Sequence, residues 1–301
     1  MALTSETAAS AAVVAPKRRN AFLGFVMRLI REKPLGAAGA LIFLLFLLCG
    51  IFADFLAPYG YNQISPINRL KPPSWKFPFG TDNLGRDILS RCIYGAQLSV
   101  IIGFCAAGLA TVISVVVGIL SGYLGGRFDM IVQRLVDAWM SFPDLIVLIV
   151  VVSVVGPGLV PIIVILGLLL GIGGSRIIRG ATISVRENMY VNAAQSMGAS
   201  MPRILFKHIL PNVMPPIIIL FTTRVGFVIL AESGLSFLGL GVPPPAPTWG
   251  GMLSGSGRTF MMQGPWLALA PGICLTVVVY ASNVFGDALR DLLDPRMRGS
   301  R

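Results

Sequence analysis

The chain has 301 residues, of which 55% are apolar and 12% charged, and its mean hydropathy is +0.80. Soluble domains carry about twice this share of charged residues, so the composition excludes an ordinary soluble fold and indicates an integral membrane protein. The net charge of +11 requires no nucleic acid as a partner, because basic residues that flank membrane spans face the anionic lipid bilayer.

Apolar segments recur along the chain, and each is long enough to cross a hydrocarbon core of about 30 Å as a helix. We expect an all-α fold with six transmembrane helices near residues 35–57, 96–122, 135–155, 159–175, 214–238 and 266–287. Only Gly156-Pro157-Gly158 and Pro161 separate the third segment from the fourth. Because the roughly 40 apolar residues of these two segments are too many for one crossing, we expect a tight turn between them.

The basic residues predict the orientation of the chain. If the amino terminus is cytoplasmic, 17 of the 24 Lys and Arg residues fall on the cytoplasmic side, which is the side that positive residues in short loops favour. Both termini are therefore expected in the cytoplasm. The expected layout is a cytoplasmic tail over 1–34, the first helix over 35–57, an extracytoplasmic loop over 58–95, a five-helix core over 96–289 with a cytoplasmic loop at 177–213, and a cytoplasmic tail over 290–301. An amphipathic segment is expected near Phe22 to Ile30.

The residues that catalysis or metal binding would need are scarce. His208 is the only histidine, and none of the five lysines is followed by Ser or Thr, as a phosphate-binding G-x-x-x-x-G-K-[ST] loop requires. The four cysteines lie in or beside apolar segments and fit no disulfide framework. We therefore expect no catalytic residue, no metal site and no cofactor bound by this chain.

A polar, basic segment at residues 190–216 stands between two long apolar segments and has the composition of a docking surface. Residues 192–197 can form a short helix, which Gly198 can end by taking the left-handed conformation. A second helix can begin with Ser200 as its N-cap and run until Pro211 re-enters the membrane. We expect a rigid elbow of two short helices; an ordinary basic cytoplasmic loop is the alternative.

Within this segment, Asn192-Ala193-Ala194 is followed by Gly198 four residues later and by Leu210-Pro211 twelve residues after the glycine. This spacing resembles the EAA loop of the permease subunits of ABC importers. In that family the loop seats in a groove of a cytoplasmic ATPase subunit, and the resemblance implies that Arg203 and Lys207 offer charge to that partner.

Two residues depart from the family pattern. Asn192 stands where the loop usually has Glu, which removes one potential charged contact. His208 stands where many relatives carry Ile, and a histidine there is common in the peptide-permease branch of the family.

A second stretch, residues 79–99, reads FGTDNLGRDILSRCIYGAQLS. It resembles a segment of the C-type subunit of dipeptide, oligopeptide and nickel permeases, and further pieces extend the resemblance over about residues 30–298. In physical terms, the glycines can fold the loop, the aspartates can cap backbone amides or pair with the arginines, and residues 88–93 can form an interfacial helix. The candidate residues are Gly80, Asp82, Gly85, Arg86, Asp87 and Arg91. The loop can cover a translocation mouth, receive a substrate-delivering protein, or act as a structural plug.

Two ionisable residues, Arg224 and Glu232, fall inside the fifth apolar segment. A charge there needs a partner or a watery cavity, and the two side chains are too far apart to pair with each other. We consider them candidates for a transport pathway; contact with a partner permease is the alternative. Asp137 and Asp144 lie near the start of the third segment, where pairing with Arg134 or an interfacial position is expected.

Taken with the resemblance, these features predict a type I ABC importer-like permease in a bacterial cytoplasmic (inner) membrane. The resemblance implies a second homologous permease subunit, two cytoplasmic ATPases that hold ATP and Mg²⁺, and an extracytoplasmic substrate-binding protein. The expected substrate is a dipeptide or oligopeptide; a nickel chelate, glutathione or an opine is the alternative within the same class. A stand-alone secondary transporter is the alternative from another class, and an intramembrane enzyme is disfavoured by the absence of a clustered catalytic site.

Overall fold

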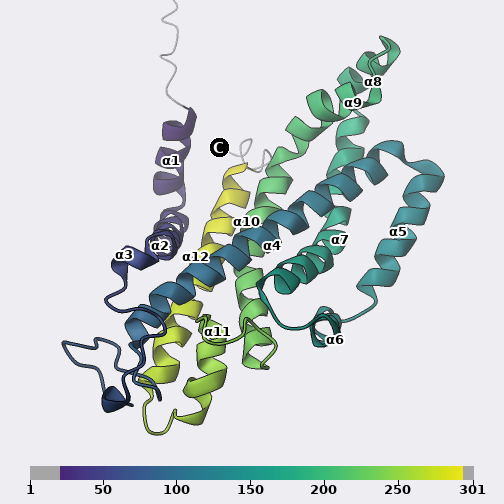
Figure 1. The fold of residues 1–301 in the computed structure, drawn as a ribbon. Coiled ribbons are helices and arrows are strands. Elements are labelled where there is room, and N and C mark those ends of the chain that lie inside the picture. The colour runs from purple at the N-terminus through teal and green to yellow at the C-terminus, as the bar shows by residue number, and fades with distance from the viewer. Residues whose placement is uncertain (1–20, 294–301) are drawn as a thin grey trace, which may run out of the picture.

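The computed structural model of the chain describes residues 21–293 and consists of helices joined by short connections and one long loop (Figure 1). The predicted parts of both tails that fall at 1–20 and 294–301 lie outside the described residues. In chain order the first half contains α1 (Ala21–Glu32), α2 (Pro34–Ile51), α3 (Ala53–Leu56), the 3₁₀ turn η1 (Pro66–Asn68), α4 (Ile88–Leu124), α5 (Gly126–Met140) and α6 (Asp144–Val155). The second half contains α7 (Leu159–Arg186), α8 (Met189–Ser196), α9 (Met201–Ile204), the π-helical turn η2 (Leu205–Ile209), α10 (Leu210–Phe237), α11 (Trp249–Met252), the π-helical turn η3 (Leu253–Gly257) and α12 (Trp266–Leu293).

Five helical stretches among the described residues are long and apolar enough to cross a membrane: α2, α4, α7, the continuous stretch from α9 through α10, and α12. The sixth expected span, 135–155, is a pair of helices, α5 and α6, that meet at an angle of 82°. The break lies at Pro143, whose ring excludes the helical conformation for the residue before it and whose nitrogen donates no hydrogen bond. Six spans therefore hold only if this bent pair crosses as one.

The helix α4 begins earlier than the sequence predicts. Residues 88–93 are not a separate interfacial helix, as expected, but the first turns of a single helix of 37 residues. Its length of about 55 Å at 1.5 Å per residue exceeds a hydrocarbon core of about 30 Å. The Asp87 carboxylate caps its first turn by accepting a hydrogen bond of 2.8 Å from the Ser90 amide. Its ends therefore project beyond the apolar layer.

The amphipathic segment expected before the first span is present as α1, which packs against the last turns of α12. Leu29 is buried there with Ala288 and Leu292, and the Lys33 ammonium pairs with the Asp291 carboxylate at 2.5 Å. Both described ends of the chain point to the end of the bundle that carries α8 and α9 (Figure 1). An even number of membrane crossings requires both ends to lie on the same side of the membrane.

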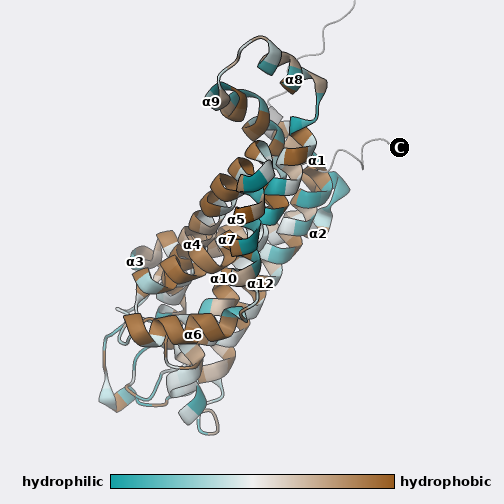
Figure 2. Cartoon of the chain, turned by 90° about the vertical axis from the view of Figure 1, so that its right-hand side faces the viewer, coloured by the Kyte–Doolittle hydropathy of each residue, from teal (hydrophilic) through white to brown (hydrophobic). Residues whose placement is uncertain are grey.

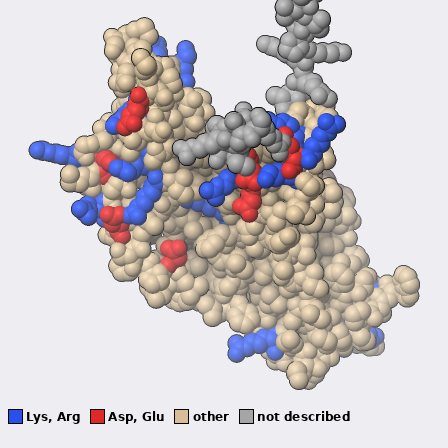
Figure 3. Space-filling model, turned by 180° about the vertical axis from the view of Figure 1, so that it is seen from behind, with Lys and Arg blue, Asp and Glu red and all other residues tan. Residues whose placement is uncertain are grey.

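The distribution of apolar and charged residues fits a bilayer. Apolar colour follows the spanning helices and α6 in Figure 2, and a broad surface without charges separates the two charged ends of the molecule in Figure 3. Many large apolar side chains on this surface are exposed, including Leu35, Val112 and Val154. In water such a surface would be unfavourable, whereas lipid or a neighbouring subunit covers it without cost.

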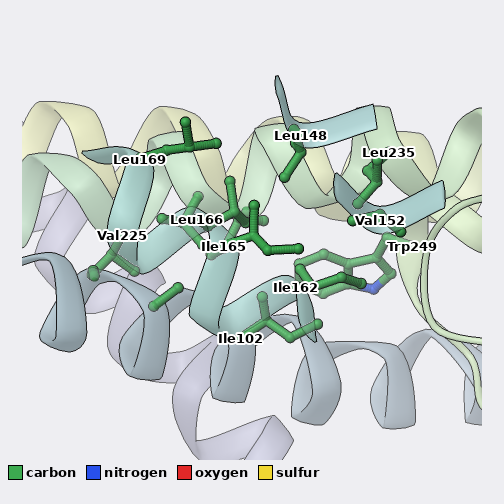
Figure 4. Close-up of a cluster of buried hydrophobic side chains, with 14 of the residues drawn as sticks. Ile102, Leu148, Val152, Ile162, Ile165, Leu166, Leu169, Val225, Leu235 and Trp249 are labelled. Carbon is green, nitrogen blue, oxygen red and sulfur yellow. The ribbon is translucent and has the colours of Figure 1, made fainter. Parts of the chain in front are cut away.

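The main core joins α4, α6, α7, α10, α11 and α12 (Figure 4). Trp249 is its largest fully buried side chain, and the indole nitrogen of Trp249 donates to the Cys92 carbonyl at 3.0 Å. Ile102, Ile162 and Val225 belong to the same cluster and come from three different helices. The indole therefore ties the short helix α11 to the outer half of α4.

Small residues let α4 and α7 approach closely. A Cβ added at Gly118 would lie 2.6 Å from the Ser175 carbonyl oxygen, and one added at Gly122 would lie 2.9 Å from the Arg179 carbonyl oxygen. The Ser114 hydroxyl also donates to the Gly171 carbonyl at 2.7 Å. Close backbone contact through small residues and interhelical hydrogen bonds is how helices associate in lipid.

Gly118→Ala should therefore destabilise the protein. The new methyl group would meet a backbone oxygen that cannot rotate away, and such overpacking costs about 1–3 kcal/mol. Gly108→Ala is the matched control, because it lies on the same helix with nothing within 4 Å of the added Cβ. The measurement is the midpoint of thermal unfolding in detergent; equal midpoints for the two variants would contradict the packing argument.

Candidate functional site

The expected elbow between two short helices is present at α8 and α9. The Gly198 amide donates to the Gln195 carbonyl at 2.9 Å, and the Ala199 amide donates to the Ala194 carbonyl at 3.0 Å. These bonds satisfy the last carbonyls of α8 in the pattern of a Schellman motif. The motif needs a left-handed residue, and Gly198 has a φ of +78°. The prediction that Gly198 ends α8 in the left-handed conformation is confirmed.

The second helix differs from the prediction. Ser200 stands at the N-cap position of α9 but makes no side-chain capping bond. The expected end at Pro211 is wrong, because α9, η2 and α10 follow one another without a break. Pro211 has no amide hydrogen to donate to the carbonyl of Lys207, and the π-helical turn directly before it widens the helix at that point. The elbow therefore leads straight into a spanning helix.

One face of the elbow is anchored to the bundle. Val191 and Ala194 on α8 and Ile204 on α9 are buried, and Val191 and Ile204 share an apolar cluster with Ile119 of α4 and Ile178 of α7. The two short helices are therefore fixed to the ends of α4 and α7.

The opposite face of the elbow is exposed. Asn192, Ala193, Arg203, Lys207 and Pro211 are open to solvent, whereas His208 and Leu210 are half-buried. Two large apolar side chains, Met189 and Met197, are 87% and 82% exposed. Exposed methionines among basic residues suit a protein surface that must adapt to a partner.

The outer loop between α3 and α4 is organised by the Asp82 carboxylate. One oxygen accepts hydrogen bonds from the amides of Leu84 at 2.8 Å and Arg86 at 2.9 Å. The other oxygen accepts from Arg86 Nε at 2.7 Å and lies 3.9 Å from Arg91 Nε. The sequence left open whether Asp82 or Asp87 pairs with the arginines; Asp82 does so, whereas Asp87 caps α4.

Two glycines allow the loop to close on itself. Gly80 and Gly85 both have a φ of +74°, and a Cβ at Gly85 would lie 1.8 Å from the Ser65 carbonyl oxygen. On the outer surface, Arg86 and Arg91 line a cavity of about 600 Å³. Pro243, Pro244 and Pro247 contribute to the same cavity. The loop is thus folded, and Arg86 and Arg91 line the cavity beside it.

The two charges inside α10 are held differently. Arg224 is 8% exposed, and its Nη2 donates to the Leu170 carbonyl at 2.7 Å. Glu232 is fully buried, and one of its oxygens accepts from the Ser236 hydroxyl at 2.6 Å. As expected, each finds its partner elsewhere and the two do not pair. Glu232 is enclosed by its own chain.

One ionic contact that the sequence did not indicate holds the inner ends of α5 and α7 together. The Asp129 carboxylate accepts from Arg179 Nε at 2.6 Å and from the Ser121 hydroxyl. Asp137 pairs with Arg134 at 3.9 Å and also with Arg176. The residues of the first contact are 50 positions apart, so no local pattern could reveal it. Pairing of Asp137 with Arg134 was expected and is confirmed.

Two family descriptions match the chain. Residues 114–299 match the family described as binding-protein-dependent transport system inner membrane component. Residues 22–73 match the N-terminal transmembrane domain of oligopeptide transport permease C. Together the two matches cover most of the described helices.

Curated relatives extend over most of the chain. The oligopeptide transport system permease protein OppC of Bacillus subtilis is 40% identical over 89% of this chain and 88% of its own. The dipeptide transport system permease protein DppC of Alkalihalophilus pseudofirmus is 39% identical with the same coverage. The probable D,D-dipeptide transport system permease protein DdpC of Escherichia coli is 35% identical over both whole chains.

A solved structure has the same fold. It is a chain of the MetNI methionine ABC transporter in inward-facing conformations, with a TM-score of 0.56 and 19% identity. The match covers 68% of this chain and 96% of that chain.

Asp82→Asn should loosen the outer loop. The amide keeps an oxygen for the backbone bonds but leaves Arg86 and Arg91 without a counter-charge, and charged hydrogen bonds contribute about 1.5–3 kcal/mol. We expect faster cleavage by trypsin within residues 58–87. Asp54→Asn is the control, because Asp54 accepts only an exposed bond from Tyr94 at 3.0 Å; equal cleavage of both variants would argue against the role of Asp82.

Proposed function

This chain belongs to the family of binding-protein-dependent transport system inner membrane components, and we propose that it moves dipeptides or oligopeptides inward as one half of a pore. A second, different permease subunit would supply the other half. Two cytoplasmic ATPases would bind ATP and Mg²⁺, and an extracytoplasmic binding protein would deliver the substrate. The chain itself is a permease subunit of a multi-pass type, located in a bacterial inner membrane, and not an enzyme.

The observation that carries the coupling role is the two-faced elbow of α8 and α9. Its buried face is locked to α4 and α7, and its exposed face carries Arg203, Lys207 and the two exposed methionines. A surface with these properties can bind a partner without bending. Since α9 continues into α10, displacement of the elbow by closing ATPases would move a spanning helix directly.

The outer loop is the proposed receiving surface for the binding protein. It is large, folded by Asp82, Gly80 and Gly85, and lies at the opposite end of the molecule from the elbow (Figure 1). Arg86 and Arg91 face the hollow beside it, where they can attract an acidic surface or substrate.

Peptide is the proposed substrate because the named relatives are dipeptide, oligopeptide and D,D-dipeptide permeases. The match of residues 22–73 to oligopeptide permease C supports the same class. A nickel chelate, glutathione or an opine remains the competing substrate class.

Gly198→Val should uncouple the chain from its ATPases. A β-branched residue at a φ of +78° costs at least about 1–2 kcal/mol, so the elbow would open. Gly198→Asn is the matched control, because asparagine tolerates this conformation. With a tag on the carboxyl terminus and gentle solubilisation, mass spectrometry should find a second permease and ATPases with the wild type and the Asn variant. The Val variant should retain the permease but lose the ATPases.

The outcome against the coupling proposal is recovery of the ATPases in equal amounts from both variants. If the wild-type chain purifies without any of these proteins, the permease assignment to a multi-subunit importer fails as well. In that case a stand-alone transporter becomes the better explanation.

The substrate is tested on the complete reconstituted complex. ATP hydrolysis should rise when the binding protein is loaded with a dipeptide or oligopeptide, and it should stay at the basal rate with a nickel chelate, glutathione or an opine. Stimulation by one of those ligands and not by peptide would overturn the substrate class while leaving the importer assignment intact.

A further inference from the structure

A cavity of about 470 Å³ lies where the corner between α5 and α6 meets α7 and α10. Its volume falls within the range of about 300–1,000 Å³ that small-molecule sites occupy. The residues that matter for its chemistry are Trp139, Asp144, Leu170, Gly174 and Arg224. The corner at Pro143, which the sequence did not predict, forms one wall.

Arg224 brings an incompletely bonded cation to this cavity. Its Nη2 is used by the Leu170 carbonyl, but its buried Nη1 has no hydrogen-bond partner among residues 23–293. Its place depends on Gly174, because a Cβ there would lie 1.5 Å from Arg224 Nη2. A buried cation inside a membrane is expensive until an anion or further acceptors surround it. A carboxylate would supply both the negative charge and the hydrogen-bond acceptors.

The indole of Trp139 is a second buried donor without a hydrogen-bond partner among the described residues. Its indole nitrogen is buried and finds no acceptor within the part of the chain that the structure describes. Trp139 lines the same cavity as Arg224. Buried donors are nearly always satisfied in folded proteins. Both nitrogens are enclosed in the wall of the cavity, so an acceptor from outside the chain reaches them only if that wall moves.

Asp144 gives the cavity a negative group. It stands at the first position of α6, is exposed, and forms no ion pair with another described residue. It lines the cavity together with Arg224, yet the two do not pair with each other. The cavity therefore presents one cation and one anion that remain apart, an arrangement that matches a small molecule with charges at both ends.

We propose that this cavity is a transit site for a zwitterionic peptide, in which Arg224 receives the carboxyl terminus and Asp144 receives the ammonium group. This inference rests on the proposed function. In this site the Arg224 guanidinium donates to the carboxylate, and Trp139 lines the same cavity. The competing source of the carboxylate is an acidic side chain of the partner permease, which a titration with peptide distinguishes.

The test uses the purified complete complex without the binding protein, so that the binding protein's own preferences do not enter. Gly173→Cys places a reporter in the cavity wall, where an added Cβ meets nothing closer than 3.8 Å. Its modification by a maleimide is followed at that site by mass spectrometry. The probes are alanyl-alanine and its carboxyl-terminal amide, which differ in the carboxylate alone.

Alanyl-alanine should slow the modification of Gly173→Cys at concentrations at least about tenfold lower than the amide, the discrimination expected for a charged hydrogen bond. With Arg224→Gln added, the two probes should protect equally. Arg176→Gln is the matched control, because it removes an exposed guanidinium from α7, and it should preserve the tenfold difference. Asp144→Asn should in turn erase the difference between alanyl-alanine and its N-acetyl derivative.

Two results would overturn the proposal. The first is equal protection by alanyl-alanine and its amide in the complex that retains Arg224, including no protection by either. The second is loss of the partner permease from the purified Arg224→Gln complex, which would show that Arg224 pairs with that subunit. Either result leaves the proposed function standing, since that function is judged separately by ATPase recovery and by peptide-stimulated ATP hydrolysis.

Discussion

The close contact between α4 and α7 is the interaction on which the rest of the structure depends. Gly118 and Gly122 bring the two backbones together, and the Asp129 carboxylate with Arg179 holds α5 against the same end of α7. In lipid there is little hydrophobic force between helices, so close packing and interhelical hydrogen bonds must supply the association. The outer loop leads directly into α4, and α7 leads directly into the elbow.

Because α4 and α7 are closely packed, we expect them to move together. Packed interfaces have few alternative arrangements, so a push on the elbow is passed on as a displacement of whole helices. The elbow is fixed to α4 and α7 by Val191 and Ile204, while α9 continues into α10. A shift at Lys207 therefore reaches Arg224 along one continuous helix, whereas Leu170 and Gly174 belong to α7. Relative movement of these two helices would change the surroundings of the guanidinium.

The sequence predicted features that local physics controls. Gly198 was placed as the left-handed end of a helix because few other residues adopt that conformation without strain, and the apolar segments were placed because length and composition decide membrane crossing. The spacing of a known motif predicts which residues of the elbow bind a partner, and this stays a prediction. In each of these cases the relevant residues lie within one continuous segment of the sequence.

Other features of the structure were predicted wrongly or not at all. Residues 88–93 were expected to form an interfacial helix, but no residue there breaks the helix, and α4 runs on. The corner at Pro143 could be suspected from the proline alone, but a proline does not determine the angle of 82° between α5 and α6. The partners of Arg224 and Asp129 are 54 and 50 residues away in sequence, so their hydrogen bonds depend on tertiary structure that composition and spacing do not encode.

The contrast between Arg224 and Glu232 shows how a single helix can contain both a structural and a responsive charge. Glu232 is fully buried beside Ser236, which in turn lies 3.3 Å from Thr248, so its surroundings belong to this chain and move with it. Arg224 is held by one carbonyl of another helix and borders a cavity. Each side chain has one buried polar atom without a hydrogen-bond partner in the described part of the chain, Glu232 Oε2 and Arg224 Nη1. Arg224, however, borders a cavity, so its surroundings can change with what enters the cavity and with the position of α7. A ligand can shift a conformational equilibrium only through different affinities for its two states. Among the two charges of α10, Arg224 is the one whose surroundings satisfy that condition.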